Sequence, residues 1–124
     1  MEFKLNLPNL CPPEETESIN LKPVYRLIKG EDIRENDLLS HVEEGRRFPP
    51  NKKCEAHAIS IFKNIEGCEN LQKKFPIFRD KKIYKGQITK ECGVVDLYLG
   101  TNHLNLWVFN NVDLLSIFTE GGVK

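Results

Sequence analysis

Two runs of alternating apolar and polar residues near the C-terminal end of the chain predict a pair of antiparallel strands. The apolar positions are Val95, Leu97 and Leu99 in the first run and Leu104, Leu106 and Val108 in the second. Because successive side chains of a strand point to opposite faces, each set lies on one face. Both sets reach the same core only if the numbers of paired residues add up to an odd value.

A two-residue turn joins the strands with this parity. Gly100-Thr101 supplies glycine at the first central position, as a type II′ hairpin requires. A turn at Thr101-Asn102 keeps the parity too, so the exact register stays open. We prefer the turn at Gly100-Thr101. It pairs Leu97 with Leu104 and Val95 with Leu106.

The opposite face of this strand pair is polar and aromatic. It carries Asp96, Tyr98, His103, Asn105 and Trp107. In the preferred register Tyr98 lies opposite His103, and Asp96 lies opposite Asn105. In the more common case, the two aromatic side chains pack under a helix and His103 makes a structural hydrogen bond. Alternatively, the same face lines a pocket.

The rest of the chain predicts further strands and helices. Residues 1–23 contain four prolines and little periodicity, which indicates an extended arm. Helix starts are indicated by Asn or Asp caps, and helix ends by Gly45, by Pro76 and by Gly121-Gly122. The predicted strands are 24–28, 56–62 and 83–89, and the first two predicted helices are 37–44 and 64–75. Asn110 or Asn111 is predicted to cap a last helix that ends at Gly121-Gly122. We expect Gly67 to weaken the second helix by about 1 kcal/mol.

These elements predict a single α+β domain over residues 24–124. Its sheet is mainly antiparallel with about five strands, and two or three helices lie against one face. A length of 124 residues is typical of one domain. The 18 basic side chains equal the 18 acidic ones, which argues against general electrostatic binding of nucleic acid.

The location of the protein is inferred from what the chain lacks. It has no run of about 18 apolar residues, so no transmembrane helix and no membrane partner are expected. The first residues lack the apolar segment and cleavage site of a signal peptide. We therefore expect a cytoplasmic protein whose cysteines are reduced thiols. These cysteines are Cys11, Cys54, Cys68 and Cys92.

The candidate ligand-binding residues lie on the predicted strands. Arg26 stands between two apolar neighbours, so its guanidinium must reach the solvent, a carboxylate or an anion. Arginine would hold a phosphate or carboxylate group of a ligand, and an aromatic side chain would stack on a ring. The full set of candidates is Arg26, Ser60, Tyr98, His103 and Trp107.

Metal binding and thiol catalysis are weaker hypotheses. The gap between Cys54 and His57 lets a thiolate and an imidazole reach one zinc ion, and Cys68 with Cys92 could complete a site. The spacing fits no zinc ribbon or finger, so buried structural thiols are favoured. No local motif supports a cysteine–histidine nucleophile. We expect neither a metal nor a cofactor.

Two resemblances bear on the fold. A strand with Arg26 followed by a strand with Ser60 is distantly similar to the mono-ADP-ribosyltransferase folds, although the catalytic Glu-x-Glu that follows in that family is missing here. Residues 11–118 also resemble a group of short uncharacterised bacterial proteins, which implies a stand-alone bacterial domain without an assigned activity. The shared landmarks are Cys11-Pro12-Pro13, Tyr25-Arg26, Asp37-Leu38-Leu39-Ser40, Ala58-Ile59-Ser60-Ile61-Phe62 and His103-Leu104-Asn105-Leu106-Trp107.

Two functions are compatible with these features. The preferred hypothesis is a small binding module that recognises a protein partner or a small anion. The alternative is a small enzyme that uses Arg26, Ser60 and His103 on an anionic, nucleotide-like substrate. A pocket shared by Arg26 and His103, with Tyr98 or Trp107 as a wall, favours the enzyme. A covered Trp107 and an Arg26 bound to a carboxylate such as Asp96 favour the binding module.

Overall fold

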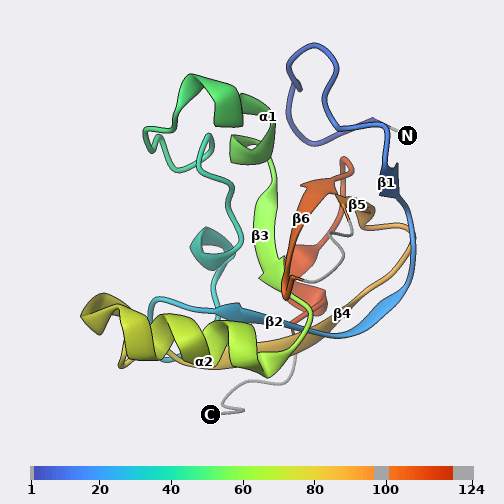
Figure 1. The fold of residues 1–124 in the computed structure, drawn as a ribbon. Helices are drawn as coiled ribbons and strands as arrows, with labels where there is room; N and C mark the ends of the chain where they lie inside the picture. The colour runs from blue at the N-terminus through green and yellow to red at the C-terminus, as the bar shows by residue number, and fades with distance from the viewer. Residues whose placement is uncertain (1, 97–100, 119–124) are drawn as a thin grey trace.

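A bent antiparallel sheet is the framework of the computed structural model, which describes residues 2–96 and 101–118. Six strands lie in the order β1-β5-β6-β3-β2-β4. In Figure 1, β3 and β6 run upright, whereas β2 and β4 cross below them with α2 alongside. The predicted single α+β domain is confirmed. The elements are β1 (Thr16–Glu17), β2 (Leu21–Leu27), α1 (Lys53–Ala56), β3 (Ile59–Phe62), α2 (Ile65–Lys74), β4 (Ile83–Ile88), β5 (Gly93–Asp96) and β6 (His103–Val108).

The predicted parity of β5 and β6 is confirmed where the structure describes both strands. Val95 pairs with Leu106, and Val94 pairs with Trp107. Val95 and Leu106 are both buried in the core. The predicted turn at Gly100-Thr101, together with the pairing of Leu97 with Leu104, includes positions outside the described residues.

The strand β3 lies on the other side of β6 and follows the same parity. Ile59 pairs with Leu106 and Ile61 with Leu104, so these aliphatic side chains enter the core together. Ser60 pairs with Asn105, and Phe62 pairs with His103. The polar partners therefore share the opposite face of the sheet.

The helix predicted over 64–75 is confirmed as α2. The Asn64 side chain accepts a hydrogen bond from the backbone N–H of Gly67 at 3.4 Å, which caps its N-terminus. The third predicted strand, 83–89, is confirmed as β4. The strand predicted to begin at residue 24 begins earlier, at Leu21, and includes Pro23.

The helix predicted over 37–44 is wrong. A short 3-10 helix, η1 (Glu35–Asp37), is followed by turns. The Asp37 carboxylate accepts hydrogen bonds from the backbone N–H groups of Lys29 and Arg34. The backbone N–H of Ser40 likewise donates to the Glu43 carboxylate, and the backbone N–H of Glu43 donates to the Ser40 hydroxyl. Such local bonds compete with a continuous helix.

Two further boundaries are corrected. The strand predicted over 56–62 begins only at Ile59, because residues 53–56 form α1 and His57 ends that helix. In the described part of the last predicted helix, which ends before residue 119, the structure has a short 3-10 helix, η4 (Leu114–Ser116), capped by Asp113 in place of Asn110 or Asn111. Asn111 has a φ of 64°, which is a left-handed conformation and not the extended one typical of an N-cap.

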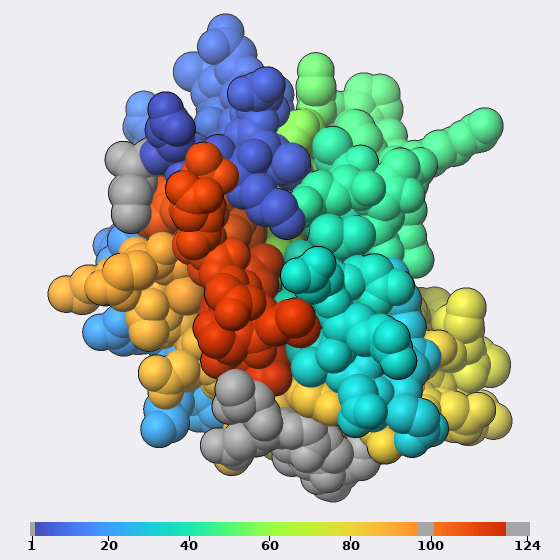
Figure 2. Space-filling view, turned by 180° about the vertical axis from the view of Figure 1, so that it is seen from behind, coloured from blue at the N-terminus to red at the C-terminus, as the bar shows by residue number. Residues whose placement is uncertain are grey.

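The N-terminal arm is fastened to the sheet at several points. β1 pairs with β5, and the backbone N–H of Lys4 donates to the carbonyl of Val108 at 2.9 Å. Seen from behind, the arm (dark blue) lies over one end of the orange-red C-terminal region in Figure 2. A disulfide joins Cys11 to Cys54. The expectation of four reduced thiols is therefore wrong for this pair, whereas Cys68 and Cys92 are free and buried.

Helix length bears on the expectation that the protein has no transmembrane helix. Among residues 2–96 and 101–118, no helix combines the length and the apolar character needed to cross a bilayer.

The Gly67→Ala variant tests the close contact between α2 and β3. A Cβ atom at Gly67 would lie 2.2 Å from Cδ1 of Phe62. Helix propensity alone favours alanine by about 1 kcal/mol, but we expect this overlap to lower the free energy of unfolding by about 1 to 3 kcal/mol. Urea denaturation measures the change. Gly30→Ala is the control, because a Cβ there meets no atom within 4 Å; equal effects of the two variants would contradict the contact.

Candidate functional site

A cavity of about 770 Å³ lies where the sheet bends. Arg26 of β2, Ser60 of β3 and both His103 and Asn105 of β6 contribute to its lining. The segment 46–56 and the 3-10 helix η3 (Pro76–Phe78) form other parts of the wall. Three residues predicted as a site from separate strands are therefore brought together in one cavity.

The Arg26 side chain holds three segments together at this cavity. Its Nε donates to the Asp37 carbonyl at 2.5 Å, and its Nη1 donates to the Ser60 carbonyl. The bonded partners are thus backbone carbonyls. Burial lowers the pKa of Arg26, and the nearby carboxylates of Glu44 and Asp37 oppose that shift. The guanidinium remains a fixed positive charge at the cavity.

Ser60 and His103 form a direct side-chain pair. The Ser60 hydroxyl and Nε2 of His103 are hydrogen-bonded. Ser60 pairs with Asn105 in the sheet, so His103 is the diagonal neighbour on the same face. Burial lowers the pKa of His103, although the charge of Asp96 opposes the shift. The imidazole is therefore mainly neutral near pH 7, and one of its two ring nitrogens is unprotonated.

The remaining polar side chains of β5 and β6 are paired away from Arg26. The Asp96 carboxylate accepts hydrogen bonds from the backbone N–H of Asn105 at 2.6 Å and from its Nδ2 at 2.9 Å. Both side chains are buried. Asp96 therefore holds Asn105 in place at the cavity lining, and it is not the partner of Arg26.

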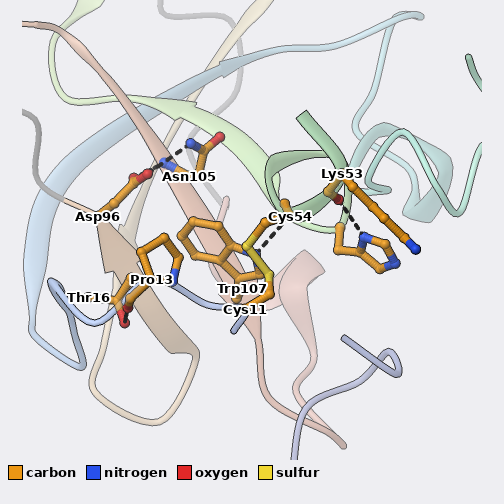
Figure 3. The surroundings of a disulfide bond; sticks show 9 residues. Cys11, Pro13, Thr16, Lys53, Cys54, Asp96, Asn105 and Trp107 are labelled. Carbon is orange, nitrogen blue, oxygen red and sulfur yellow. Dashed lines mark hydrogen bonds between the residues drawn. A yellow bond between two sulfur atoms is a disulfide. The ribbon is translucent and has the colours of Figure 1, made fainter. Parts of the chain in front are cut away.

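Trp107 lies elsewhere on the same sheet face. Its indole is fully buried, and its Nε1 donates to the Cys54 carbonyl at 3.0 Å. Figure 3 shows the ring beside the Cys11–Cys54 disulfide. The structure does not place Trp107 among the residues that line the cavity. Tyr98, the fifth predicted site residue, lies outside the described residues.

Sequence reasoning missed the basic wall of the cavity. Arg46, Arg47 and Phe48 belong to a Pro-containing segment that predicts a solvated loop, but they line the cavity. A basic cluster of this kind is usually a solvated surface, so it gave no signal of a site. Only the fold brings this segment opposite Arg26.

The charges that line the cavity do not balance. Six lining side chains are basic and three are acidic. Each acidic group already has partners among the described residues: Asp37 accepts from backbone N–H groups, Glu44 pairs with Lys29 and Arg46, and Glu55 pairs with Lys52. The basic residues are Arg26, Lys29, Arg46, Arg47, Lys52 and Lys81.

Metal coordination is not favoured at Cys54. Its sulfur is bonded to Cys11 and so is not a thiolate ligand. His57 instead uses its Nδ1 in a hydrogen bond with the Lys53 carbonyl at 2.7 Å.

Comparison with protein-family models, curated proteins and solved structures gives no match. The function is therefore argued from the geometry and chemistry of the cavity.

The pKa of His103 gives a direct test of its environment. Burial lowers it from the ordinary value of 6.5, so the unfolded state binds the proton more tightly. The contribution of His103 to the free energy of unfolding should therefore be fully present above about pH 6.5. It should decrease as the pH falls from there through the folded-state pKa. NMR titration of the His103 imidazole should give a midpoint below 6.5. A midpoint at or above that value would contradict the buried pair with Ser60.

Proposed function

We propose that the protein is a binding module whose ligand is a small organic anion held in the cavity at the bend of the sheet. The excess of basic over acidic side chains in the cavity lining carries this proposal. The net charge of the whole chain is zero, so the positive charge is concentrated at this place. A cavity lined by an excess of positive charge favours an anionic group over a neutral one.

Two basic groups are available to a ligand without loss of an existing ion pair. Arg47 is exposed and has no acidic partner among the described residues. Arg26 uses part of its guanidinium on two carbonyls, and an arginine has five N–H donors in all. A carboxylate, sulfonate or phosphate fits donors of this type.

The apolar part of the lining indicates the rest of the ligand. Three aromatic side chains, Phe48, Phe62 and Phe78, contribute to the cavity. Rings of this kind bind flat apolar groups by stacking or edge contacts. The preferred ligand therefore combines an acidic group with an aromatic or heterocyclic ring.

A matched pair of probes tests the proposed function. 1-Naphthoate and its neutral amide have the same ring and differ in charge, so we expect about tenfold tighter binding of the acid. NMR titration of the backbone amides around Ser60 and His103 measures both affinities. Equal affinities, or shifts confined to other regions, would exclude an anion site in this cavity.

Arg47→Gln then tests the basic wall. The variant removes an exposed charge, so the fold should be unchanged, and the affinity for 1-naphthoate should fall about tenfold, or 1.4 kcal/mol. Lys90→Gln is the control, because it removes an exposed positive charge away from the cavity lining. If both variants weaken binding alike, general electrostatic attraction accounts for it.

A second candidate function is favoured by the Ser60–His103 hydrogen bond. A hydroxyl beside a neutral imidazole in a cavity is suited to proton transfer. We therefore keep an enzyme that acts on an anionic, nucleotide-like substrate as the alternative. Chromatography of ATP or NAD after incubation with the protein tests it, with Ser60→Ala as the inactive variant and Ser116→Ala as the control. The absence of turnover would exclude this activity on these substrates.

The disulfide bears on the location of the protein. Disulfides persist in oxidising compartments and are rare in the cytosol. The Cys11–Cys54 bond therefore supports an oxidising compartment in place of the cytoplasm expected from the sequence. A protein partner stays a prediction, and the cavity gives it no further support.

A further inference from the structure

One wall of the cavity is tied covalently to the N-terminal arm. Lys52, Glu55 and Ala56 line the cavity at the start and end of α1. Cys54, within this short helix, is bonded to Cys11, which lies 43 residues earlier in the sequence. This bond therefore ties α1 directly to the arm.

Among the described residues, this wall is otherwise fastened by individual hydrogen bonds and an ion pair. The backbone N–H of Arg46 donates to the His41 carbonyl at 2.9 Å, the N–H of Ala58 donates to the Glu55 carbonyl at 3.0 Å, and Arg46 pairs with Glu44 at 3.5 Å. The backbone N–H of Val42 donates to the Ala56 carbonyl at 3.0 Å, and the indole of Trp107 donates to the Cys54 carbonyl at 3.0 Å. A helix as short as α1 has little stability of its own. The disulfide is thus a substantial part of what holds this side of the cavity.

We propose that the Cys11–Cys54 disulfide is a redox-active modification site whose opening by a dithiol reductant loosens the 46–56 wall and weakens anion binding in the cavity. The effect on binding rests on the proposed function. The opening of the bond and the loosening of the wall do not depend on it.

The exchange can be written in two balanced steps. A thiolate of the reductant attacks Sγ of Cys11, a mixed disulfide forms, and Cys54 leaves as a thiolate. The second thiol of the reductant, as its thiolate, then attacks the reductant's own sulfur in the mixed disulfide and releases Cys11. The reductant loses two electrons and becomes a disulfide, and the two protein cysteines end as thiols after protonation.

Exposure distinguishes the disulfide from the two free thiols. Cys11 and Cys54 are half-buried, and Leu10, next to Cys11 in the sequence, is 94% exposed. Cys68 and Cys92 are buried, and burial raises the pKa of Cys68 to about 12, so Cys68 does not compete.

Alkylation and hydrogen exchange test the site itself. After treatment with dithiothreitol, iodoacetamide should label Cys11 and Cys54 in the folded protein while Cys68 and Cys92 stay unlabelled. Amide exchange should accelerate over 46–56 but not over β3 and β6, and circular dichroism should show that the fold is retained. Unchanged exchange over 46–56, or unfolding of the whole protein on reduction, would overturn the proposal.

Binding of 1-naphthoate tests the effect on the cavity. The reduced protein and the Cys11→Ser variant should both bind at least about tenfold more weakly than the oxidised protein. Leu10→Ser is the control, because it changes the neighbouring exposed residue and keeps the disulfide. Equal affinity of the oxidised and reduced forms would overturn the link to the cavity. If the oxidised protein does not bind the probe at all, the proposed function fails, while the exchange measurement still decides the redox site.

Discussion

The arrangement of the cavity depends on the hydrogen bonds that the guanidinium of Arg26 donates to the carbonyls of Asp37 and Ser60. Among the described residues, β2 joins β3 through a single ladder pair, Tyr25 with Phe62. Arg26 adds hydrogen bonds to the carbonyls of Ser60 and Asp37, which belong to two other segments. A guanidinium is a rigid planar group whose N–H donors point in fixed directions, so it can bond two carbonyls at fixed positions. The ammonium group of a lysine is a compact charge on a flexible stem and lacks this geometry. The bend of the sheet therefore has a specific side chain that holds it.

The polar face of β6 is divided into two regions with different roles. His103 and Asn105 contribute to the cavity lining, and the Asp96 carboxylate accepts two hydrogen bonds from Asn105. Trp107 instead lies beside the Cys11–Cys54 disulfide, and its indole N–H donates a hydrogen bond to the Cys54 carbonyl in α1 (Figure 3). The same strand thus places polar groups in the cavity lining and anchors α1. This arrangement connects the arm, through the disulfide and α1, to the lining of the cavity.

Local sequence patterns predicted the parts of the fold that depend on periodicity. The pairing of Val95 with Leu106 followed from the alternation of side chains, and the Asn64 cap marked the start of α2. The helix expected over 37–44 failed because Asp37 bonds backbone groups of Lys29 and Arg34, which no periodicity indicates. The disulfide and the basic wall were missed for a related reason. Both depend on segments that are distant in sequence and that only the completed fold brings together.

The free energy of unfolding of Arg26→Lys tests the role of this side chain most directly. Lysine keeps the positive charge but cannot reproduce the bonds to the carbonyls of Asp37 and Ser60. Loss of hydrogen bonds at a buried charged group predicts a decrease of about 2 to 3 kcal/mol in urea denaturation. A change smaller than about 0.5 kcal/mol, which is typical of substitutions at ordinary surface positions, would contradict the account.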